Sequence, residues 1–162
     1  MFRKFKFEED LYEKLQTIPM STRFKLDRIG LKLTPKTWNR FSSEEKQVLC
    51  HLSVRSQGEV ECYKEYLLYL LHRLKEKVEW FDPEASKREK TQWENLTRIP
   101  ESVYLKVLTL KGLLTAVEWI RLDDLERYAL FRLSTDKYSE TQFARALEEF
   151  LGISTAKKAQ AS

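Results

Sequence analysis

Apolar residues recur at intervals of three and four along most of the chain, which is the spacing of an amphipathic α-helix. Polar residues fill the intervening positions, and no run predicts a strand longer than a few residues. Glycine, proline and side-chain caps divide the pattern into segments. The predicted helices of the first half cover residues 8–17, 19–29 with Gly30 as the stop, a short stretch after Thr34-Pro35, a stretch after Ser42, and 59–77 with Gly58 as the cap.

The second half of the chain repeats the first. Shifted by 81 positions, residues 18–70 fall on residues 99–151 without a gap, with about 14 identities in roughly 53 pairs, where about 3 would be expected for unrelated chains. Helix-start signals recur too: Ser42 and Glu45 are spaced as a capping box, and Asp123 and Glu126 occupy their places in the second copy. Thr115 and Glu118 are also spaced as a capping box. The predicted fold is therefore all-α, a helical bundle of two pseudo-symmetric three-helix repeats plus an N-terminal helix, packed about a pseudo-twofold axis.

A chain of 162 residues is about the size of one domain. Trp38 and Trp119 hold equivalent places and are expected to anchor short helices to the core. Trp80, Phe81 and Trp93 flank a polar connection and are expected to pin its ends. The predicted organisation is a single domain over 1–152, with repeat one over about 18–77, the surface connection over 82–98, repeat two over about 99–151, and a frayed tail over 153–162.

Charge adds a constraint on partners. The net charge is +4, and the whole excess lies in residues 1–81. This modest field suits an acidic partner but is too weak to indicate nucleic acid. The first residues have no apolar run behind them, and the longest apolar stretch, Tyr66 to Leu71, is too short to span a membrane. We expect a soluble, cytoplasmic protein without a membrane partner.

Candidate chemistry is sparse. The soft metal ligands are Cys50, His51, Cys62 and His72, and their spacing matches neither zinc nor di-iron patterns. No Gly-x-Ser-x-Gly or phosphate-binding glycine loop is present. Clustered acids such as Glu8-Glu9-Asp10 stand at predicted helix starts, where the helix dipole explains them. The sequence therefore predicts no catalytic residue, no metal and no cofactor, and the protein is not expected to be an enzyme.

The most suggestive surface is a cationic run in the first half, opposed only by Asp27. Three of its members would share one face if the helix continued near Gly30. The second copy keeps only Lys106 and Arg121 at the matching positions. A solvated helix face is the plain alternative to a docking patch for an acidic protein. The run consists of Arg23, Lys25, Arg28, Lys32, Lys36 and Arg40.

Several motifs, in order and over nearly the whole chain, resemble the nitrate reductase-associated protein family. The resemblance implies an accessory protein of cyanobacterial nitrate assimilation, needed for active assimilatory nitrate reductase, in assembly or in maturation of its molybdenum centre. It implies no catalytic residues. The motifs are Phe5-x-Phe7-Glu8-x-Asp10, the stretch from Ile18-Pro19-Met20 through Arg23-Phe24-Lys25-Leu26-Asp27, Gly30 and Lys32-Leu33 to Trp38, Phe41-Ser42-x-Glu44-Glu45, Tyr63-x-Glu65, Ile99-Pro100, Glu126-Arg127-Tyr128-Ala129-Leu130-x-x-Leu133-Ser134, and Phe143-x-x-Ala146-Leu147-x-Glu149-Phe150.

Two hypotheses follow. The first is a non-enzymatic accessory protein that docks on an assimilatory nitrate reductase or a related molybdoenzyme through its basic side chains. The second is a helical module that binds a small anionic ligand, such as a molybdopterin-type cofactor, in the cleft between the copies. Arg23, Arg28 and Tyr128 are the predicted contacts of that ligand.

Overall fold

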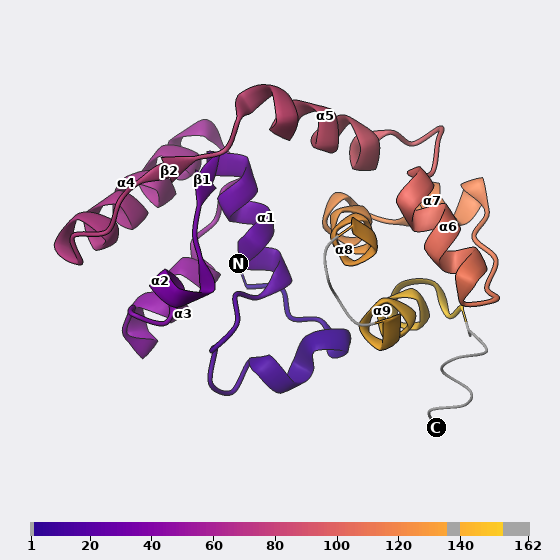
Figure 1. Ribbon diagram of the computed structural model, residues 1–162, viewed down its shortest axis with the longest axis horizontal. Coiled ribbons are helices and arrows are strands. Elements are labelled where there is room, and N and C mark those ends of the chain that lie inside the picture. The colour runs from indigo at the N-terminus through magenta and orange to yellow at the C-terminus, as the bar shows by residue number, and fades with distance from the viewer. Residues whose placement is uncertain (1, 136–139, 154–162) are drawn as a thin grey trace. The chain divides into compact units, whose positions relative to one another are not determined.

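The computed structural model describes residues 2–135 and 140–153 and is mostly helical (Figure 1). The predicted all-α class is confirmed, because the strands in the described part of the chain are two segments of two residues each. In chain order the elements are a 3-10 helix η1 (Lys6–Leu11), α1 (Met20–Ile29), β1 (Leu31–Lys32), α2 (Pro35–Trp38), α3 (Ser43–His51), α4 (Gln57–Arg73), β2 (Glu79–Trp80), α5 (Pro83–Glu94), α6 (Glu101–Thr109), α7 (Ala116–Arg121), α8 (Asp124–Thr135) and α9 (Glu140–Leu151).

The chain divides into two compact units. Of the described residues, the first unit holds 2–4 and 8–86, and the second holds 5–7, 87–135 and 140–153. Whether the two units form the single domain predicted over 1–152 stays a prediction. Of the predicted frayed tail, residues 154–162 lie outside the described residues.

In the first unit, α1 packs against α3 and α4. The N–H of Gly30, at φ 80°, closes α1 on the carbonyls of Leu26 and Asp27, and the chain then enters β1. β1 pairs antiparallel with β2, and Leu31 lies opposite Trp80. The core of this unit is formed by Leu15, Ile18, Leu26, Ile29, Leu31, Trp38, Phe41, Leu49, Cys50, Val54, Tyr63, Leu67, Leu70 and Leu71.

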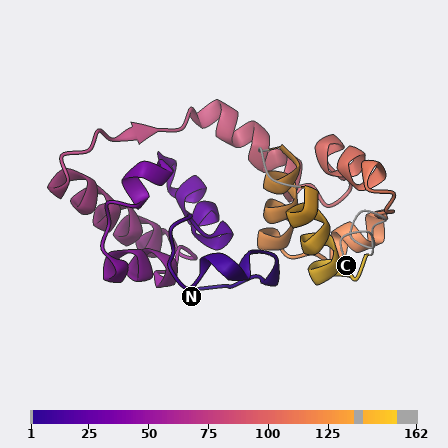
Figure 2. The ribbon, with the colours of Figure 1, turned by 60° about the horizontal axis from the view of Figure 1, so that its bottom comes forward.

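In the second unit, α8 packs against both α6 and α9, and α8 and α9 run side by side (Figure 2). Residues 5–7 belong to this unit. The carboxylate of Glu149 accepts the N–H groups of Lys6 and Phe7 at 2.8 and 3.0 Å. The rings of Phe5 and Phe7 stack at 5.3 Å, and both meet Phe150 edge-on. A segment from the start of the chain is thus held by its last helix.

Helix starts in the two units are spaced as the repeat predicts. Met20, Pro35 and Ser43 begin α1, α2 and α3, and positions 101, 116 and 124, each 81 residues later, begin α6, α7 and α8. The predicted capping boxes form at Ser42 with Glu45 and at Thr115 with Glu118. A rotational relation between the units stays a prediction.

Three details of the sequence prediction were wrong. The N-terminal helix over 8–17 is instead the 3-10 helix η1, interrupted by non-helical backbone at Glu8. The Glu8 carboxylate accepts the N–H of Met20 at 3.1 Å, so it caps α1 rather than its own segment. α4 is capped by Ser56, not Gly58, and ends at Arg73 rather than at 77. The hydrogen bond from Met20 to Glu8 and the cap at Ser56 thus replace the helix starts that the local sequence predicts.

The polar connection over 82–98 contains a regular helix, α5. Trp93, in the last turn of α5, is buried, as predicted, and its ring meets the ring of Tyr128 edge-on at 5.6 Å. Trp80 does not pin the other end to the core, because 48% of it is exposed and its ring lies under the ammonium of Lys64.

Candidate protein-docking surface

Four exposed cations lie within residues 28–40, and we call them the basic segment: Arg28, Lys32, Lys36 and Arg40. They come from three elements, since Arg28 stands in the last turn of α1, Lys32 in β1 and Lys36 in α2. Lys25, Arg28 and Lys32 would share one face only if the helix continued past Gly30, and it does not, because α1 ends at Gly30 as predicted. The turn at Gly30 and the pairing of β1 place Lys32 instead.

The cations of the basic segment differ in their contacts. Arg28 donates from Nη2 to the carbonyl of Arg55 at 3.3 Å. The ammonium of Lys32 lies 5.8 Å from the centroid of the Phe81 ring. Arg40 forms an ion pair with Glu76, which offsets part of its charge. Lys32 and Lys36 are therefore the members of the basic segment best placed to attract an acidic partner, because Arg28 and Arg40 already bind groups of this chain.

The other two residues of the predicted run lie deeper. Arg23 is half-buried in α1. Lys25 is 5% exposed, and its Nζ donates to the carbonyl of Cys50 at 2.6 Å. Burial lowers the pKa of Lys25 to about 8. Lys25 therefore serves the interior of the first unit, where it joins α1 to α3, and its side chain is not presented to a partner.

Lys25 lies in a small buried polar cluster that sequence reasoning did not find. The Thr22 hydroxyl donates to the Cys50 thiol at 3.3 Å. Burial raises the pKa of Cys50 above its usual value, while the hydrogen bond from Thr22 and the charge of Lys25 act in the opposite direction. A thiol held protonated by burial is a poor nucleophile. The cluster therefore connects α1 to α3 within the first unit.

The lowered pKa of Lys25 predicts how the stability of the protein depends on pH. Its value is 10.5 in the unfolded chain and about 8 in the fold, so between these values the unfolded state binds more protons and stability from this group rises with pH. We expect the stability of the wild type relative to Lys25→Met to increase from about pH 7 to about pH 10. Urea denaturation followed by circular dichroism at each pH measures this difference.

The comparison with Lys25→Met removes the contributions of groups that do not interact with Lys25. Cys50, whose pKa is raised by burial, opposes the trend as pH passes its usual value of 9.0, and because its pKa also responds to the charge of Lys25, the measured difference includes the interaction between these two groups. A stability difference that stays constant over this pH range would show that the ammonium is not desolvated.

The second unit holds Tyr128, one of the predicted ligand contacts. Tyr128 is 1% exposed, and the guanidinium carbon of Arg132 lies 5.5 Å from its ring centroid. The other predicted contacts, Arg23 and Arg28, belong to the first unit. The small-ligand site at Arg23, Arg28 and Tyr128 stays a prediction.

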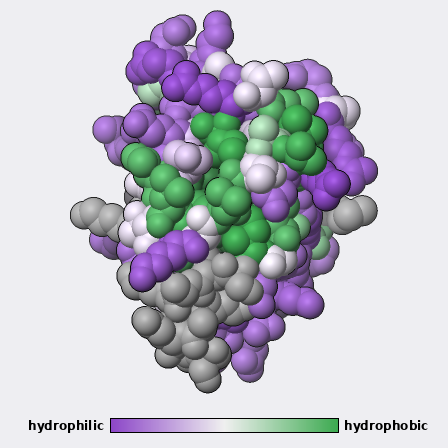
Figure 3. Space-filling view, turned by 90° about the vertical axis from the view of Figure 1, so that its right-hand side faces the viewer, coloured by the Kyte–Doolittle hydropathy of each residue, from purple (hydrophilic) through white to green (hydrophobic). Residues whose placement is uncertain are grey.

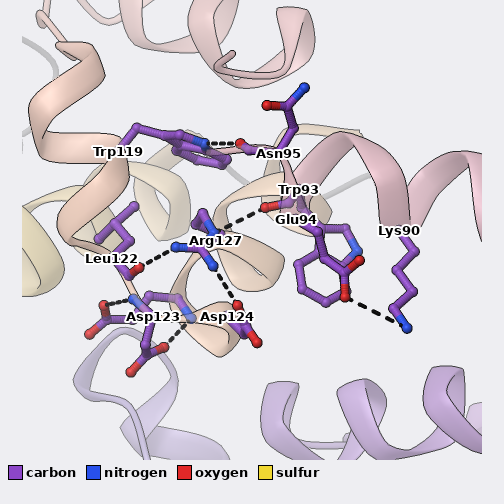
Figure 4. A network of polar contacts seen from close by, with 10 residues as sticks. Lys90, Trp93, Glu94, Asn95, Trp119, Leu122, Asp123, Asp124 and Arg127 are labelled. Atoms are coloured by element: carbon purple, nitrogen blue, oxygen red, sulfur yellow. Dashed lines mark hydrogen bonds and ion pairs between the residues drawn. The ribbon is translucent and has the colours of Figure 1, made fainter. Parts of the chain in front are cut away.

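The buried guanidinium of Arg127 organises the same region (Figure 4). Its Nε donates to the carbonyl of Trp93 at 3.1 Å, Nη1 donates to the carbonyl of Leu122, and Nη2 forms an ion pair with Asp124. These bonds join α5 and the turn after α7 to α8. The sequence motif Glu126-Arg127-Tyr128 therefore contains a structural arginine and a buried tyrosine, which its charge alone does not reveal.

No group of three or more His, Cys, Asp or Glu side chains that could hold a metal ion occurs within residues 2–135 and 140–153. Cys50 is buried and Cys62 is exposed, and both are free thiols. Among the described helices, none combines the length and apolar character needed to cross a membrane.

Comparison with known proteins identifies one family. The family model described as conserved nitrate reductase-associated protein matches residues 4–150. No curated protein matches the chain, and no solved structure matches it. The match begins before η1 and ends at Phe150 in α9, so it covers both compact units.

Proposed function

Because the chain belongs to the conserved nitrate reductase-associated protein family, we propose that it is a non-enzymatic accessory protein that docks on an assimilatory nitrate reductase or a related molybdoenzyme. Docking would support the assembly or the activity of that enzyme. The family match over residues 4–150 carries this proposal.

The basic segment is the proposed contact with the enzyme. Charged groups at the rim of an interface act mainly on the rate of encounter and on its salt dependence. Lys32 and Lys36 are exposed and follow one another at an interval of four residues. They would meet acidic side chains of the partner, and salt would screen this attraction beyond a Debye length of about 8 Å at physiological ionic strength.

We also propose that the scaffold arose by duplication and that its two units are related by a pseudo-twofold axis within one domain over 1–152. The shared spacing of helix starts supports this origin. Trp38 and Trp119 support it as well, since each is fully buried and donates its indole N–H to a carbonyl in the segment before α1 or α6, Leu15 and Asn95 respectively. As an accessory of an assimilatory enzyme, the protein would act in the cytoplasm.

Charge reversal at Lys32 and Lys36 tests the docking proposal. We expect the double variant K32E/K36E to bind purified assimilatory nitrate reductase with an association rate at least about 10-fold lower at low salt. The difference from the wild type should shrink as salt is added, because screening removes the steering. Biolayer interferometry at two salt concentrations gives both rates.

The chain supplies a control of equal charge. K87E/R88E changes the same net charge on α5, where both side chains are exposed, and it should retain most of the wild-type association rate. An equal fall in both double variants would show that only net charge matters. Failure of the wild type to bind the enzyme at low salt would contradict the docking proposal itself.

A further inference from the structure

Helices α6 and α7 carry apolar residues on both of their faces. Val103 and Val107 of α6 and Trp119 of α7 point into the second unit and are at most 1% exposed. A helix that is apolar all round is normally buried on all sides, yet these two have an exposed apolar side. We call this side, together with Leu113 of the connection between the two helices, the apolar face. Its six residues are between 44% and 67% exposed, and they are Tyr104, Leu105, Leu108, Leu113, Val117 and Ile120.

Figure 3 shows that hydrophobic residues gather on the side of the molecule where α6 and α7 lie, with polar residues between and around them. Six large side chains at about half exposure present on the order of 600 Å² of apolar surface. That equals the largest patch expected on a soluble monomer, and patches of this size mark sites of interaction.

The corresponding positions in the first unit show that the fold does not require apolar residues there. Shifted by 81 positions, Leu108, Leu113, Val117 and Ile120 correspond to Asp27, Lys32, Lys36 and Asn39. α1, β1 and α2 form with those polar residues in place. The apolar character of the second unit's face is therefore a property of this surface and not a need of the helices beneath it.

We propose that the apolar face is covered by the same face of a second copy of this chain, in an isologous dimer. Two such faces would bury about 1,200 Å² in total, which reaches the lower limit for a specific interface. Homodimer interfaces are also more apolar than transient ones, because they stay closed. The basic segment is typical of a transient interface, whereas the apolar face is typical of a permanent one.

The charged residues around the apolar face are of both signs, which favours self-association over binding to a partner that carries only positive or only negative charge. Exposed Lys111 and Arg121 stand in this segment beside exposed Glu101 and the half-buried Glu118. A twofold contact brings each residue near those of the other copy, so a rim that holds both signs can pair with itself.

Sedimentation equilibrium of the full chain tests the dimer. We expect a dissociation constant in the micromolar range or tighter for the wild type. The double variant L113K/V117K introduces the residues that the first unit holds at the matching positions. It should weaken association at least about 100-fold, because each twofold contact would then bury four unpaired ammonium groups.

The exposed Tyr69 of α4, outside the apolar face, provides the matched control. Y69K should leave the dissociation constant unchanged, and circular dichroism should show that L113K/V117K keeps its helices. A wild type that stays monomeric up to about 1 mM would overturn the proposal and leave the face to a different partner or to the chain's own end. A dimer that L113K/V117K does not weaken would overturn it as well. Both outcomes are independent of nitrate reductase binding, which K32E/K36E tests on other residues.

Discussion

Replacing Trp38 with alanine is expected to lower the free energy of unfolding by about 3–5 kcal/mol, the range for truncating a large buried aromatic side chain. Trp38 has no exposed surface, and its ring meets that of Phe41 edge-on at 6.2 Å. Its indole N–H also donates to the carbonyl of Leu15 at 2.7 Å. Leu15 has a φ of 49°, a conformation that a leucine rarely adopts. Trp38 therefore fills the core of the first unit and fixes the chain that leads into α1.

Urea denaturation followed by far-ultraviolet circular dichroism measures this loss. Trp80→Ala removes the same side chain from an exposed site and should cost less than about 1 kcal/mol. Trp38→Phe retains much of the packing but leaves the Leu15 carbonyl without the indole donor, so an intermediate loss of about 1–3 kcal/mol is expected. If Trp38→Ala cost no more than Trp80→Ala, the anchoring role would be disproved.

Replacing Arg127 with methionine is expected to cost about 3 kcal/mol. The guanidinium is 5% exposed, and it supplies the hydrogen bonds to the buried carbonyls of Trp93 and Leu122. Methionine fills a similar volume but donates no hydrogen bond, and an unsatisfied buried carbonyl costs about 1–3 kcal/mol. The loss should be visible as a lower midpoint in urea denaturation, together with a greater exposure of Trp93 by fluorescence quenching.

Two further variants separate the bonds of Arg127 from its charge. Asp124 is 67% exposed at its side chain, so Asp124→Asn should cost less than about 1 kcal/mol. Arg121→Met removes an exposed arginine from α7 and should stay within about 0.5 kcal/mol of the wild type. A larger loss for Asp124→Asn than for Arg127→Met would mean that the ion pair, rather than the carbonyl bonds, holds this part of the second unit together.

Much of the fold could be predicted because its signals are local. A capping box needs residues only three positions apart, and those at Ser42 and Thr115 form as predicted. Gly30 ends α1 because its φ of 80° suits a residue without a side chain. The helix α5 was not expected, since its polar residues show no broad apolar stripe, yet Trp93 is buried and Glu89 reaches Arg132 at 2.7 Å.

The candidate site was predicted only in part. Lysine and arginine residues along a helix look alike in a sequence, whether they face solvent or the interior. Lys25 and Arg28 are three positions apart, yet one is buried on the Cys50 carbonyl and the other is exposed. The apolar face was also missed as a surface. The signal for it was present, because Tyr104 and Leu108 of α6 stand where α1 has the charged residues Arg23 and Asp27.

The sequence by itself determined the all-α class, most helix limits and the family, because capping, glycine stops, helical spacing and motif order depend on residues close together or on their order along the chain. Tertiary structure alone decided that Glu8 caps α1, that Glu149 holds residues 6 and 7, that Lys25 and Arg127 are buried, and that α6 and α7 expose apolar side chains. These properties depend on contacts between residues far apart in the sequence and on the surface that those contacts leave exposed. A local sequence pattern contains no information about either.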